Sequence, residues 1–209
     1  MPVIGFDLDM TLVDSADAIV ECCRYACAQH GVEMDDTWVR STIGLPLDEV
    51  FAVLLPGVPY DEPLAHYREH YLTHGLAMQE LLPAAREVLE SVTSDGWRVM
   101  VVSAKKDTHV EKVLEVVGLD GFVDLVVGER FGDQKGESLR EEGAEVYVGD
   151  HPGDVVGARA AGAVAVAVST GPTSADDLRD AGADVVLDDL TQFAPWWHAY
   201  LAARGSAVR

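Results

Sequence analysis

The hydrophobic and polar positions of the chain divide it into three parts. The run from Val3 to Phe6 is apolar and leads into acidic residues, which predicts a buried strand that ends at a polar edge. A second part has apolar residues at helical spacing and no strand signal, and Ser15 is a candidate N-cap where it begins. This part predicts helices over 16–30, 35–42, 47–55 and 61–74.

After Pro83 the pattern changes to helices and strands in alternation. Helices are predicted over 84–94, 107–117 and 154–161, with two more beginning near Ser174 and Thr191. Strands are predicted over 97–103, 122–127, 144–149, 164–168 and 184–187. Such alternation implies right-handed crossovers and a parallel sheet covered on both faces. We therefore expect an α/β fold with a doubly wound parallel sheet, formed by residues 1–14 and 81–209, and an inserted all-helical domain of residues 15–80.

Polar residues stand directly after several of the predicted strands. Asp7, Ser103 and Asp150 each follow an apolar run. In open parallel sheets, ligands bind at the carboxyl ends of the strands. Asp7 and Asp9 are two apart and share a face, so their carboxylates repel unless one is protonated or a divalent cation lies between them. An aspartate can also be a nucleophile in phosphoryl transfer.

Charge and composition limit the partners. The 209 residues include 15 Lys and Arg against 36 Asp and Glu, a net charge of -21, which argues against nucleic acid or an anionic membrane as a partner. No apolar run approaches the ~18 to 20 residues that span a bilayer, and the N-terminus lacks a basic segment followed by an apolar one. We expect a cytoplasmic protein, either a monomer or a homodimer. Three cysteines close together in one predicted helix indicate packing and not a disulfide framework or a zinc site.

Four motifs in order resemble those of one enzyme superfamily. Asp-x-Asp-x-Thr at residues 7–11 resembles the first signature of the haloacid dehalogenase superfamily, in particular its phosphoglycolate phosphatase-like members. Ser103 and Lys135 stand where that family has a strand-end Ser or Thr and a lysine. Residues 149–162, Gly-Asp-His-Pro-Gly-Asp and an alanine-rich stretch, resemble its acidic motif.

The resemblance implies a mechanism and a metal. Mg²⁺ would be held by Asp7, Asp150 and the backbone carbonyl of Asp9, with Asp154 as a further candidate metal residue or a helix cap. Asp7 would attack phosphorus, and Asp9 would protonate the leaving alcohol and later deprotonate the hydrolytic water. Dehalogenases of the superfamily lack this second aspartate.

The resemblance also implies how the phosphate is bound. Ser103 and Lys135 would stabilise its oxygens, helped by backbone N–H groups near Ala104 and Met10. Only fourteen residues separate Lys135 from Asp150, fewer than in typical relatives, so Lys105 or Lys106 is the alternative lysine. Met10 stands where many relatives have Gly.

The helical insertion resembles the family's small cap, which closes over the site. Arg40 is a candidate ligand for a substrate carboxylate, or an exposed arginine at a helix end. The expected function is that of a Mg²⁺-dependent phosphatase acting on a small-molecule phosphate ester similar to phosphoglycolate. Two alternatives stay open, namely a phosphosugar mutase of the same superfamily and a noncatalytic binding module with this fold.

Overall fold

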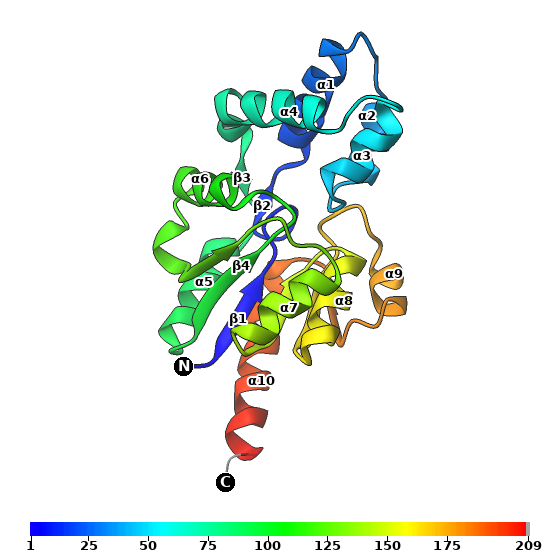
Figure 1. Cartoon of the computed structure of the whole chain (residues 1–209). Coiled ribbons are helices and arrows are strands. Elements are labelled where there is room, and N and C mark those ends of the chain that lie inside the picture. Colours follow the sequence, from blue (N-terminus) through cyan, green and yellow to red (C-terminus); the bar gives the residue numbers. More distant parts are fainter. Residues whose placement is uncertain (208–209) are drawn as a thin grey trace.

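A six-stranded parallel sheet lies at the centre of the structure, a computed structural model that describes residues 1–207 (Figure 1). The strand order is β5-β4-β1-β6-β7-β8, so β1 lies in the interior of the sheet between β4 and β6. The strands are β1 (Val3–Phe6), β4 (Arg98–Val102), β5 (Leu125–Val127), β6 (Ala144–Gly149), β7 (Val164–Val168) and β8 (Val185–Leu187).

Helices cover both faces of this sheet. Successive strand residues point to opposite faces, and Val99 and Val101 of β4 belong to one hydrophobic core while Met100 and Val102 belong to the other. The first core includes α5 (Ala85–Ser94), α6 (Asp107–Val117) and α10 (Phe193–Ala207), and the second α7 (Asp133–Glu141), α8 (Pro152–Ala161) and α9 (Ala175–Asp180). Short 3-10 turns are η2 (Asp120–Phe122) and η3 (Leu190–Gln192). The doubly wound α/β fold is confirmed.

A helical segment lies beyond the end of the sheet at which β1 finishes (Figure 1). It consists of α1 (Ala16–Gln29), α2 (Asp36–Ser41), α3 (Leu47–Leu54), α4 (Asp61–Thr73) and the turn η1 (Gly75–Met78). The sequence pattern did not predict the two short strands at its ends, β2 (Val13–Asp14) and β3 (Glu80–Leu81), which pair antiparallel. The three cysteines are buried and free in α1, as predicted.

Several element ends differ from the sequence prediction. Ser15 occupies the N-cap of α1, but its Oγ makes no hydrogen bond. Helix α8 begins two residues before Asp154, because Pro152 is well suited to the first helical turn. His151 is the N-cap, and Asp154 caps it from inside the helix by accepting the His151 N–H at 3.0 Å. Across residues 1–207, none of the helices has the length and hydrophobicity of a membrane span.

Candidate active site

Three buried carboxylates meet at the carboxyl edge of the sheet. Asp7 follows β1, Asp150 follows the neighbouring strand β6, and Asp154 lies in the first turn of α8. Each offers an oxygen within 4.8 Å of the others. Within the described residues, this is the one group of three acidic, histidine or cysteine side chains spaced to hold a metal ion.

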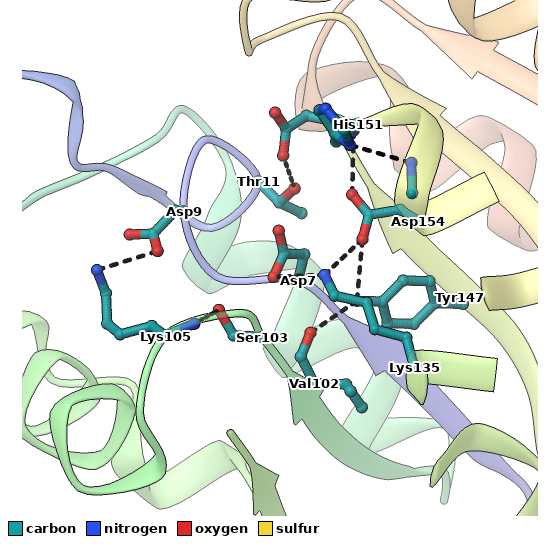
Figure 2. A network of polar contacts seen from close by, with 12 residues as sticks. Asp7, Asp9, Thr11, Val102, Ser103, Lys105, Lys135, Tyr147, His151 and Asp154 are labelled. Atoms are coloured by element: carbon teal, nitrogen blue, oxygen red, sulfur yellow. Dashed lines mark hydrogen bonds and ion pairs between the residues drawn. The ribbon is translucent and has the colours of Figure 1, made fainter. Parts of the chain in front are cut away.

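Lys135 reaches this cluster from the first turn of α7. Its Nζ lies 3.0 Å from Oδ1 of Asp7 and 2.6 Å from Oδ1 of Asp154, and Figure 2 shows it between the two acids. Two glycines allow this approach of α7 to α8: a Cβ at Gly157 would lie 2.9 Å from Cβ of Lys135, and a Cβ at Gly136 would lie 2.8 Å from the carbonyl oxygen of Gly157. The short spacing between Lys135 and Asp150 is therefore accommodated by close helix packing.

The charges in this cluster do not balance. One ammonium faces three carboxylates, so two negative charges remain when all the acids are ionised. Burial raises the pKa of Asp7 to about 7 although Lys135 acts in the opposite direction, and burial together with Asp154 raises the pKa of Asp150. Bringing these acids together in ionised form requires a further positive charge.

Asp150 has one buried oxygen without a hydrogen-bond partner, and Gly171 packs closely against it. Thr11 Oγ1 donates to Oδ1 of Asp150 at 3.0 Å, while Oδ2 has no hydrogen-bond partner. A Cβ at Gly171 would lie only 1.9 Å from Oδ2, so a larger residue would collide with this oxygen. Carboxylate oxygens, two uncompensated charges and an unpartnered oxygen together fit a hard divalent cation, and Mg²⁺ is one such ion.

Asp9 points to a different partner. Its Oδ2 lies 3.0 Å from Nζ of Lys105, and its Oδ1 has no hydrogen-bond partner. Figure 2 shows this pair apart from the cluster around Lys135. Lys135 therefore lies against Asp7, and Lys105 lies against Asp9. A role of Asp9 in metal binding through its backbone carbonyl stays a prediction.

The turn after Asp9 explains the position of Met10. Met10 has φ of 58°, in the left-handed region where many relatives carry Gly, and its side chain is buried. Its N–H donates to the carbonyl oxygen of Val13 at 2.8 Å. This N–H is bonded within the turn, and the binding of phosphate by backbone N–H groups near Met10 stays a prediction.

A pocket of about 490 Å³ lies between the helical segment and the core. Asp7, Asp9, Ser103 and Ala104 line it, whereas Lys135 contacts Asp7 from outside the lining. Ser103 is buried directly after β4, and its Oγ accepts the Lys105 N–H at 3.3 Å. Most of the predicted site residues are therefore brought together.

Arg40 is the exception. It is exposed in the last turn of α2, forms an ion pair with Asp17 and does not line the pocket. This agrees with the alternative of an exposed arginine at a helix end, and a contact with substrate stays a prediction. The arginine of the helical segment that does line the pocket is Arg68 in α4, whose Nη2 lies 2.6 Å from Oε1 of Glu129. Sequence reasoning missed Arg68, although its helical spacing from Leu64 places both on one face of α4.

His109 and Tyr71 also escaped the sequence analysis. His109 lines the pocket, and its ring stacks on that of Tyr71 with centroids 5.4 Å apart. Burial, followed by the charge of Lys105, lowers the pKa of His109 to about 4, so the ring is neutral at neutral pH. No motif marks either residue.

The structure is that of an α/β protein with an acidic cluster at the carboxyl edge of its sheet and a helical segment over that edge (Figure 1). The chain belongs to the haloacid dehalogenase-like hydrolase family, whose model matches residues 4–168. The family resemblance read from the motifs is confirmed.

Known relatives cover most of the chain. The protein named "Probable phosphatase IndB" of Dickeya dadantii is 29% identical over 99% of this chain and 98% of its own. A phosphoglycolate phosphatase of Aquifex aeolicus is 31% identical over 78% of this chain and 82% of its own. A haloacid dehalogenase-like hydrolase of Streptococcus pneumoniae shares the fold with a TM-score of 0.84, at 24% identity over 94% of this chain and 98% of that one.

Proposed function

We propose that this chain is a phosphatase that hydrolyses small phosphate monoesters with Mg²⁺ and through an aspartyl-phosphate at Asp7. One observation carries the proposal: three buried carboxylates and a lysine form one cluster, and one of these carboxylates, Asp7, lines a pocket between the helical segment and the core. The phosphatase names of relatives that cover most of the chain support it. In this proposal, residues 15–80 form a cap over a core of residues 1–14 and 81–209.

In this proposal the acidic cluster both holds the metal and supplies the nucleophile. Asp7, Asp150 and Asp154 would hold Mg²⁺, which offsets negative charge on the transferring phosphoryl group. Lys135 holds Oδ1 of Asp7, which leaves the second oxygen of that carboxylate to attack phosphorus in line with the leaving oxygen. The Asp7 O–P bond forms as the bond from phosphorus to the leaving oxygen breaks.

Asp9 moves the protons of both half-reactions. It gives a proton to the leaving oxygen in the first step and takes one from water when the aspartyl-phosphate is hydrolysed. Ser103 Oγ and the N–H of Ala104 bind the phosphoryl oxygens at the pocket wall, and Lys135 adds positive charge behind Asp7.

The pocket supports a small substrate that carries a second anionic group, as phosphoglycolate does. Arg68, Lys106 and Arg130 all line the pocket. Arg68 reaches it from the helical segment and Arg130 from the loop after β5. A guanidinium can bind a carboxylate with two hydrogen bonds, and Arg68 would exchange Glu129 for such a substrate.

The test is hydrolysis of a panel of phosphate esters, phosphoglycolate included, by the purified chain with Mg²⁺ or with EDTA. We expect metal-dependent turnover that falls more than about 10³-fold in Asp7→Asn, because the nucleophile is lost. Asp133→Asn, an exposed acid in the same first turn of α7 as Lys135, is the matched control and should keep full activity. Turnover that survives in Asp7→Asn would exclude Asp7 as the nucleophile. Transfer of phosphate to a second hydroxyl, with a requirement for a bisphosphate, would identify a mutase instead.

A further inference from the structure

Three side chains form a column from the pocket floor into the helical segment. Asp9 follows β1, Lys105 follows β4, and Tyr71 belongs to α4 of the helical segment. Nζ of Lys105 lies 3.0 Å from Oδ2 of Asp9 and 4.4 Å from the ring centroid of Tyr71. The ring of Tyr71 in turn lies parallel to that of His109, at an interplanar angle of 3°. Lys105 is thus enclosed between an acid of the core and an aromatic ring of the segment that covers it.

This ion pair is shielded from water. The side chains of Lys105 and Asp9 are only 7% and 13% exposed, whereas exposed pairs such as Lys112 with Glu115 leave both partners about half exposed. A buried pair is screened less than an exposed one and holds its geometry better. The face of Tyr71 attracts the ammonium where it stands, because a cation over an aromatic ring is stabilised and more so when it is desolvated.

The two oxygens of Asp9 have different surroundings. Oδ2 is engaged by Lys105, whereas Oδ1 has no hydrogen-bond partner and Asp9 lines the pocket. The ion pair with Lys105 fixes Oδ2 and leaves Oδ1 available to a substrate. The same ion pair also limits rotation of the carboxyl group about its own axis.

We propose that Lys105 is a positioning residue, which fixes the Asp9 carboxyl so that Oδ1 meets the leaving oxygen of the substrate, and that Tyr71 holds Lys105 in place. The inference rests on the proposed function, in which Asp9 is protonated on Oδ1 when the substrate binds and transfers that proton to the leaving oxygen as the P–O bond breaks. Lys105 at Oδ2 then pairs with the carboxylate that this step leaves behind. It adds a link between the helical segment and the chemistry, because Tyr71 reaches Lys105 only while α4 lies over the site.

The competing role for Lys105 is direct contact with the substrate phosphate, since Lys105 also lines the pocket. The two roles differ in their dependence on the leaving group. An alkoxide needs a proton from Asp9, but 2,4-dinitrophenolate leaves as a stable anion without one. Phosphate binding, by contrast, is the same for both esters.

The experiment measures kcat/KM of wild type and Lys105→Met on an alkyl phosphate and on 2,4-dinitrophenyl phosphate. We expect a loss of about 10²-fold on the alkyl ester, as for a misplaced catalytic group, and less than about threefold on the aryl ester. Lys112→Met, at an exposed position in α6, is the control and should match wild type on both esters.

Two further variants test the route through Asp9. Asp9→Asn should show the same difference between the two esters, and adding Lys105→Met to it should cost no further activity on the alkyl ester, because the group that Lys105 positions is already gone. Tyr71→Leu should reproduce the difference at smaller size, with Tyr71→Met in its place if the leucine variant does not fold.

Equal losses on both esters in Lys105→Met would overturn the proposal in favour of phosphate binding, and no loss on either would overturn it as well. Additive losses in the double variant would exclude the route through Asp9. A wrong proposed function would give a different result from a wrong role for Lys105, because wild type would then show no Asp7-dependent turnover on either ester.

Discussion

Lys135 carries the positive charge of the acidic cluster, and its removal tests the charge balance directly. Lys135→Met keeps a long side chain of similar volume, so the packing of α7 on α8 changes little. The ammonium that lies 3.0 Å from Asp7 and 2.6 Å from Asp154 is lost. Three buried carboxylates then have no cationic side chain within the cluster.

The expected cost follows from burial. The side chain of Lys135 is 3% exposed and those of its two partners are 6% and 4% exposed, so solvent screens the loss very little. Removing one partner of a buried ion pair costs about 3–5 kcal/mol. For a chain of this length, 1 kcal/mol lowers Tm by about 2–4 °C, which gives a fall of about 6–20 °C.

The assay is thermal unfolding at pH 7.5 in EDTA. Lys112→Met is the control: its partner Glu115 is three residues away on the exposed face of α6, and exposed pairs of this kind contribute little to stability. Saturating Mg²⁺ should raise the Tm of Lys135→Met by more than it raises that of wild type, because the cation offsets the same carboxylates. A fall in EDTA of less than about 2 °C would refute the argument that Lys135 compensates buried charge.

Three other variants test separate parts of the site. Gly171→Ala places a Cβ 1.9 Å from Oδ2 of Asp150 and should displace this carboxylate. The Mg²⁺ concentration for half-maximal activity should then rise about 10-fold or more. An unchanged concentration would exclude this oxygen as a ligand. His109→Gln should flatten the pH dependence of stability measured by urea unfolding. The unfolded histidine takes up a proton near pH 6.5 and the folded one only near pH 4. Wild type therefore loses stability as the pH falls between these values, and equal slopes in wild type and variant would contradict the burial of a neutral ring. Arg40→Ala should leave kcat/KM for phosphoglycolate within about twofold of wild type, because Arg40 pairs with Asp17 outside the pocket. A loss of tenfold or more would show that Arg40 contacts the substrate.

The sequence by itself determined the strands of the parallel sheet, their polar ends and the motif order. Apolar runs that end at Asp7, Ser103 and Asp150 are local patterns, and the burial that makes a strand is encoded in the same residues. The ends of parallel strands meet at one edge of a sheet, so local pattern and topology together placed these residues at one site. The helical character of residues 15–80 was readable in the same way.

Only the tertiary structure decided which cation meets which acid. Lys135 and Lys105 were alternatives in the sequence, and the structure places the first against Asp7 and the second against Asp9. The position of Lys135 depends on close helix contacts at Gly136 and Gly157, between elements whose approach no short pattern encodes.

The arginine at the pocket was decided in the same way. Arg40 and Arg68 both lie on helices of the covering segment, and the packing of α2 and α4 directs one to Asp17 and the other to the pocket. A sequence specifies the apolar face of each helix, but the orientation of one helix relative to another arises from side-chain packing across elements distant in the chain. The identity of the acids is therefore a property of the sequence, and the pairing of their cations is a property of the packed fold.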